Sequence, residues 1–271
     1  MFGFFFKKNT WDIWENIFYV LILNFMFLLV GFGAFFLTTW IWRNFGFAPF
    51  TFSLLVFVWV FTILSLAAGP NALKIAGFDS VKFSGFFSKI GESVKDGLLL
   101  GSFIWVLFNI NAISVPFYYG MWHGVSDDGN PLYLIPLMLI VWFTLTTVFA
   151  LQWFIPIRSA MHNNFLKILK KCYIVFLDNL GFSFGLFFLN LLNLVISVFT
   201  VTVMPGINGI ILTQTNAFRL RLYKYDWLEV NPDLTPAERK NVPWDQLLAK
   251  DKKQFGHKTF KTILFPWKEN Q

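Results

Sequence analysis

The residues that could form specific contacts inside the apolar part of this chain are amides, not acids, bases or nucleophiles. Asn109, Asn193, Asn208 and Gln214 lie within long apolar runs, and Pro205 interrupts the last of these runs. An amide without a partner is costly in an apolar environment, and a proline frees a backbone carbonyl that also needs a donor. We therefore expect these five residues to form polar contacts between helices or with a partner.

Chemistry beyond hydrogen bonding is not indicated by the sequence. No nucleotide-binding loop of the GxxxxGK[ST] form occurs. The three histidines lie in separate segments, and His123 is expected on the opposite side of a membrane from His162 and His257, which argues against a shared metal site. Asp127 and Asp128 near His123 fit a solvated acidic turn better than a cation site. We expect no cofactor, no metal and no enzymatic activity.

The elements that must position these amides are long apolar spans. The composition is 56% hydrophobic and only 14% charged, whereas a soluble domain carries about 25% charged residues. Each span is near the ~20 residues that cross a bilayer as a helix. The sequence thus predicts an all-α integral membrane protein with about six transmembrane helices, at Ile17–Trp40, Phe50–Gly69, Gly97–Tyr119, Leu132–Ile155, Asp178–Val198 and Thr200–Arg219.

The basic residues fix the expected orientation. Of the 22 lysines and arginines, all but Arg43 fall in segments that a six-span arrangement places on one side. Because basic loops face the cytoplasm, both termini are expected there, in a bacterial cytoplasmic membrane. The net charge of +7 is explained by these loops, so we expect contact with the lipid bilayer and no nucleic-acid binding.

Three regions follow from this pattern: an interfacial N-terminal segment (1–16), a transmembrane domain (17–219) and a cytoplasmic basic tail (220–271). Two basic loops, Ala72–Lys95 and Asn163–Asp178, carry apolar residues at helical spacing and predict amphipathic helices. In the tail, Thr235 and Glu238 have the spacing of a helix capping box, Pro243 opens a second short helix, and Lys258–Trp267 resembles a docking strip.

Parts of the sequence suggest an internal repeat. Pro70 and Pro156 each follow an apolar span and precede a basic stretch, and the next spans carry the glycine pairs Gly97/Gly101 and Gly181/Gly185 followed eight residues later by Asn109 and Asn193. The match indicates either a parallel repeat of spans 2–3 and 4–5 or a chance similarity. The glycine pairs allow close helix packing, which we expect between spans 3 and 5 within one chain.

The last span is expected to be broken or bent at Pro205-Gly206, with Asn208 and Gln214 turned toward protein instead of lipid. Its polar residues allow two interpretations. One is a kinked helix packed against its neighbours, and the other is a broken helix that lines a polar cavity or contacts a partner's transmembrane helices.

Several short motifs resemble the YesL-like bacterial membrane proteins. They are Leu21-Ile-Leu-Asn24-Phe-Met-Phe-Leu-Leu, Ala68-Gly69-Pro70-Asn71-Ala72, Phe86-Phe87-Ser-Lys89 and Phe154-Ile155-Pro156 with the Lys-rich helix after it. That family has no known biochemical function, and its genes often lie beside carbohydrate ABC importers. The resemblance implies a multi-spanning fold over about Trp11–Tyr225 and supplies no catalytic residues.

Two functional hypotheses follow. The first is an accessory, non-catalytic subunit that binds the permease subunits of a carbohydrate ABC importer. The alternative is a stand-alone carrier or channel for a small neutral solute, because the spans hold no mid-membrane acid or base for ion coupling. The sequence leaves the oligomeric state open.

Overall fold

The computed structural model describes residues 1–124, 129–161, 163–201 and 204–256, and within them it is helical without strands. Five stretches are long and apolar enough to cross a membrane: α2 (Ile17–Phe45), α3 (Phe47–Ala76), α4 (Phe83–His123), Pro131–Ala160 and α8 (Leu180–Phe199). The stretch Pro131–Ala160 comprises the 3-10 turn η1 (Pro131–Tyr133), α5 (Leu134–Leu151) and α6 (Phe154–Ala160). The prediction of an all-α, multi-spanning membrane protein is confirmed.

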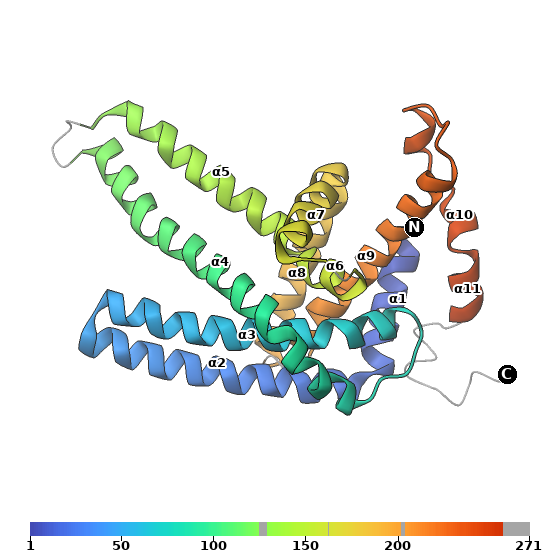
Figure 1. The fold of residues 1–271 in the computed structure, drawn as a ribbon, viewed down its shortest axis with the longest axis horizontal. Helices are drawn as coiled ribbons and strands as arrows, with labels where there is room; N and C mark the ends of the chain where they lie inside the picture. Colours follow the sequence, from blue (N-terminus) through green and yellow to red (C-terminus); the bar gives the residue numbers. More distant parts are fainter. Residues whose placement is uncertain (125–128, 162, 202–203, 257–271) are drawn as a thin grey trace.

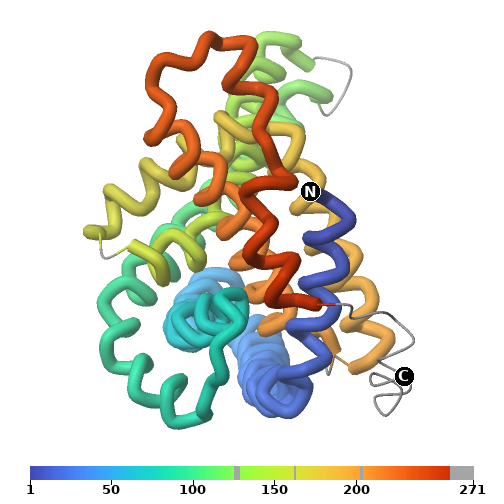
Figure 2. The backbone as a smooth tube through the Cα atoms, turned by 90° about the vertical axis from the view of Figure 1, so that its right-hand side faces the viewer, coloured from blue at the N-terminus to red at the C-terminus, as the bar shows by residue number. Residues whose placement is uncertain are grey.

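Two helical hairpins extend from one end of the molecule and diverge from each other (Figure 1). We call α2 with α3 the first arm, and α5 with the part of α4 after Gly101 the second arm. Gly46 joins α2 to α3 with a φ of 81°, a left-handed conformation that favours glycine. Figure 2, turned by 90°, also shows the arms apart, so the divergence is not an effect of one view.

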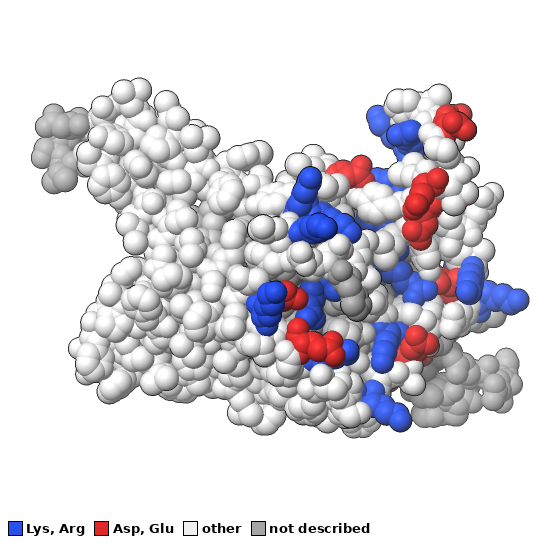
Figure 3. Space-filling model, viewed as in Figure 1, with Lys and Arg blue, Asp and Glu red and all other residues white. Residues whose placement is uncertain are grey.

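Charged residues gather at the end from which the arms extend. On the face seen in Figure 3, lysines, arginines, aspartates and glutamates cover that end, while the arms show none. Both terminal segments lie there, because the ring of Phe255 contacts the rings of Phe4 and Trp11. Phe4 and Phe255, near the two ends of the described chain, therefore lie together at the charged end.

The second basic loop forms the amphipathic helix α7 (Phe165–Asp178), as predicted. Its inner face buries Ile168, Cys172 and Phe176, and its outer face exposes Leu166 and Ile174. The first basic loop is different, because α3 continues to Ala76 and the second half of the loop is the start of α4. In both loops the apolar residues at helical spacing pack on the ends of the spans.

The order of elements agrees with the suggested repeat, but the junctions differ. In the first unit α3 runs through Pro70 without a break and α4 is one helix of 41 residues. In the second unit Gln152 and Trp153 separate α5 from α6, and Asn179 separates α7 from α8. The helices α3 and α4 pack along each other, whereas α5 and α8 make few contacts.

The expected sixth span does not exist as one helix. Helix α9 begins at Gly206 and runs to Val230, past Arg219 where the transmembrane domain was expected to end, and it is not among the apolar candidate spans. The helix is enclosed by α1 (Phe2–Glu15), α2, α3, α6 and α8. Protein surrounds α9 where lipid would surround a span, which explains why its sequence is the most polar of the long helices.

The tail has the short elements that its sequence predicts. Thr235 and Glu238 form a reciprocal capping box, in which the Thr235 N–H donates to the Glu238 carboxylate at 2.8 Å and the Glu238 N–H donates to the Thr235 hydroxyl at 3.4 Å. The turn η2 (Glu238–Lys240), α10 (Trp244–Leu247) and α11 (Ala249–Phe255) follow. Leu248 and Asp251 are buried against the body, and Lys258–Trp267 lies outside the described residues.

Candidate functional site

A buried polar junction lies where the start of α9 meets α2. The Asn24 side chain on α2 donates from Nδ2 to the Pro205 carbonyl at 2.8 Å and accepts at Oδ1 from the Asn208 backbone N–H at 2.8 Å. The side chain is almost completely buried. It therefore gives the Asn208 N–H, in the first turn of α9, the partner that the helix does not supply. It also adds a second donor to the Pro205 carbonyl, which accepts from the Gly209 N–H at 3.0 Å.

Only glycine fits at the turn itself. Gly206 has a φ of +62°, and a Cβ at this position would lie 2.3 Å from Cγ of Asn24. The Gly206 N–H donates to the Ser197 hydroxyl near the end of α8 at 2.8 Å. The turn between α8 and α9 is thus tied both to α2 and to the preceding helix.

A buried polar network continues from this turn along α9. The Thr213 hydroxyl accepts from the Asn9 amide at 3.0 Å and from the Asn193 amide at 3.2 Å. Asn216, one turn further, donates to the Asp12 carboxylate at 2.9 Å. The network joins α1, α8 and α9, and its bonds between α1 and α9 connect residues 204 positions apart.

An ion pair closes the network on α1. Lys8 and Asp12 lie one helical turn apart, with Nζ and Oδ2 2.5 Å apart, and both are buried. Burial lowers the pKa of the Lys8 ammonium and raises the pKa of the Asp12 carboxyl, and the attraction between the two groups opposes both changes. Such a pair is tolerated in the interior because Asn216 and the Phe78 ring, 4.1 Å from the Lys8 nitrogen, also contact it.

The structure brings three of the five predicted polar residues together. Pro205 and Asn208 lie at the Asn24 junction, and Asn193 lies in the network along α9. Asn208 faces protein, as expected. Its Oδ1 atom is buried without a hydrogen-bond partner in the described part of the chain. Gln214 is half-buried on α9, and Asn109 lies away on the second arm, where it donates to the Trp105 carbonyl of its own helix at 2.8 Å.

The glycine pairs do not pack as predicted. Cβ atoms added at Gly97 and Gly101 would lie 2.4 Å from Ile63 and 2.7 Å from Trp59, so this pair packs tightly on α3. Gly181 and Gly185 have nothing within 4 Å of an added Cβ. The expectation that the two pairs bring spans 3 and 5 together is therefore wrong, since α4 uses its glycines against α3.

Sequence reasoning missed most of the network partners. Asn24 lies in an apolar span like several other amides, and residues 1–16, which contain Lys8, Asn9 and Asp12, are predicted to form an interfacial segment. The spacing of Lys8 and Asp12 at i and i+4 is the one sequence signal that pointed to a pair.

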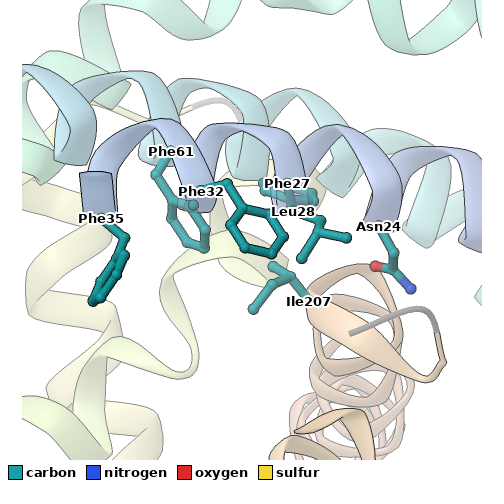
Figure 4. Close-up of a pocket in the computed structure, with 8 residues that line it drawn as sticks. Asn24, Phe27, Leu28, Phe32, Phe35, Phe61 and Ile207 are labelled. Carbon is teal, nitrogen blue, oxygen red and sulfur yellow. The ribbon is translucent and has the colours of Figure 1, made fainter. Parts of the chain in front are cut away.

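An apolar groove adjoins the junction (Figure 4). It has a volume of about 320 Å³, is open along α2, and ends at Asn24. Phe27, Leu28 and Phe32 of α2 form one wall, and Phe61 of α3 and Ile207 of α9 complete it. The groove can hold an apolar chain, and none of its lining residues is an acid, base or nucleophile.

No metal centre is found in the part of the chain that the structure describes: it has no group of three or more His, Cys, Asp or Glu side chains placed to hold an ion. The single cysteine, Cys172, is fully buried.

No protein-family model, curated protein or solved structure matches this chain.

Proposed function

We propose that this protein is an accessory, non-catalytic membrane subunit that binds the permease subunits of a bacterial carbohydrate ABC importer. The observation that carries the proposal is the divergence of the two arms, which leaves apolar faces of α4 and α5 without contacts in the chain. Ile113, Phe117 and Leu139 are 60%, 56% and 63% exposed. Apolar faces of this kind are surfaces on which transmembrane helices of another subunit can pack. The resemblance to the YesL-like family supplies the class of partner.

Hydrogen bonding in the arms favours the role of an accessory subunit over that of a solute carrier. Asn111 and Thr144 bond to each other between α4 and α5 at 2.8 Å, and the Trp59 indole donates to the Ser102 hydroxyl between α3 and α4 at 2.9 Å. The Trp105 indole likewise donates to the Thr51 carbonyl at 2.6 Å. These polar groups join neighbouring helices, α4 to α5 and α3 to α4, whereas a passage for a neutral solute needs polar groups that face the passage.

For the topology we propose four crossings, by α2, α3, α4 and the α5–α6 stretch, with the charged end and both termini in the cytoplasm. The turn between α8 and α9 is bonded to Asn24, which lies about 10 Å along α2 from Ile17 and about 32 Å from Phe45 at 1.5 Å per residue. Figures 1 and 2 show α8 running across the first arm. We therefore infer that the α8–α9 hairpin enters the bilayer and returns to the same side.

Affinity purification of the tagged chain in a mild detergent tests the function. We expect permease subunits to be recovered with it, and a photoreactive amino acid at Ile113, 60% exposed, to crosslink to them. The matched control is Leu107 on the same helix, which is 8% exposed and should not crosslink. Recovery of the chain without any transporter subunit, under conditions that keep the importer intact, would contradict the proposal. Solute flux in liposomes containing only this chain would favour the carrier.

A further inference from the structure

A second cavity lies between the first half of α4 and the start of α7, at the edge of the charged end. It has a volume of about 760 Å³ and is lined on one side by Lys95, Asp96 and Leu99, and on the other by Asn164, Leu166 and Lys167. In the sequence, Lys95 stands just before the apolar run that begins at Gly97. The cavity therefore lies where the polar and apolar parts of the molecule meet.

The cavity has excess positive charge. Lys95 and Lys167 are exposed, and neither forms an ion pair among the described residues. The one acid in the lining, Asp96, is paired with Arg158, whose Nε lies 3.0 Å from Oδ2 of Asp96. The two lysines are thus free to pair with an anion from outside the chain.

The same cavity has an exposed apolar wall. Leu99 is 42% exposed and Leu166 is 75% exposed, although both lie within a few residues of the free lysines. A soluble anion would leave these leucines uncovered, whereas an anion that carries an acyl chain would cover them. Two cationic groups beside an apolar wall match the anionic headgroup and the first acyl carbons of a phospholipid.

We propose that this cavity binds an anionic phospholipid of the cytoplasmic leaflet. The phosphate pairs with Lys95 and Lys167, and the first acyl carbons pack on Leu99 and Leu166. The Asn164 amide, at the lip of the cavity, supplies a further donor for the glycerol or headgroup oxygens. This site is separate from the Asn24 junction and does not depend on an importer as partner.

The test is native mass spectrometry of the full chain in detergent with added phosphatidylglycerol or phosphatidylcholine. We expect retention of phosphatidylglycerol and at least about tenfold lower retention in Lys95→Gln/Lys167→Gln, since each basic group at a membrane surface contributes about a factor of five. The matched control is Lys252→Gln/Lys253→Gln in α11, which removes the same charge and should retain the lipid. An elution profile equal to the wild type's shows that each variant is folded.

Three results would overturn the proposal. One is equal retention of the two lipids by the wild type, a comparison that needs no variant. Another is equal loss of lipid in both double variants, which would indicate a general effect of net charge. The third is displacement of the lipid by millimolar inorganic phosphate, which would indicate a site for the free anion.

Discussion

Replacing Asn24 by alanine should loosen the α8–α9 hairpin. The substitution removes the hydrogen bonds to the Pro205 carbonyl and from the Asn208 N–H, both 2.8 Å long and buried. Interhelical hydrogen bonds in membrane proteins contribute about 0.6 kcal/mol on average and at most about 1.7 kcal/mol. Two of them give an expected loss of about 1–3 kcal/mol in the free energy of unfolding. The Asn208 N–H is left without a partner, whereas the Pro205 carbonyl keeps its bond from the Gly209 N–H at 3.0 Å.

The assay is unfolding by titration with sodium dodecyl sulfate in mixed micelles, followed by tryptophan fluorescence and far-ultraviolet circular dichroism. Asn44→Ala is the matched control, because the Asn44 amide is exposed and donates only to the Trp40 carbonyl of its own helix. Its unfolding free energy should change by less than about 0.5 kcal/mol. Equal effects of the two substitutions would refute the argument that Asn24 holds the turn.

Two further matched pairs test the packing at and near the charged end by the same titration. Gly97→Ala should lower the free energy of unfolding by about 1–3 kcal/mol, because its Cβ would lie 2.9 Å from the Ile63 backbone. Gly181→Ala should leave the free energy of unfolding unchanged or raise it by up to about 1 kcal/mol. A larger loss in Gly181→Ala than in Gly97→Ala would contradict the assignment of Gly97 to the α3 contact. Arg158→Met should lower the free energy of unfolding by about 1–3 kcal/mol, because it breaks the largely buried ion pair with Asp96 and the hydrogen bond to the Glu92 carbonyl at 2.9 Å. Lys89→Met breaks only an exposed pair and should cost less than about 1 kcal/mol, so comparable losses would show that the Arg158 contacts contribute little.

The apolar spans of the arms could be predicted from hydropathy, because their exposed positions are mostly apolar. The capping box at Thr235 and the amphipathic helix α7 could be predicted because both depend on residues close in sequence. Helix α9 is different, because hydropathy predicts a span at Thr200–Arg219 whereas the helix runs from Gly206 to Val230 and is not a lipid-facing span. Hydropathy finds helices in contact with lipid, and α9 is enclosed by protein.

The partners in the candidate site could not be predicted for a related reason. Asn24 bonds to a carbonyl 181 residues away, and Asn216 bonds to Asp12 204 residues away. A single sequence carries no signal for such pairings. The glycine pairs show the same limit, because the GxxxG spacing predicts a close contact but does not identify the helix that makes it.

Cysteine accessibility in intact cells tests the four-crossing arrangement most directly, and Cys172 gives no background because it is fully buried. We expect an impermeant thiol reagent to label Asn44→Cys in intact cells and Arg239→Cys only after the cells are opened. Phe199→Cys, at the end of α8 and 83% exposed in the described chain, should be labelled in neither case because it faces lipid within the bilayer. Labelling of Phe199→Cys from outside would show that α8 crosses the membrane and would contradict the account.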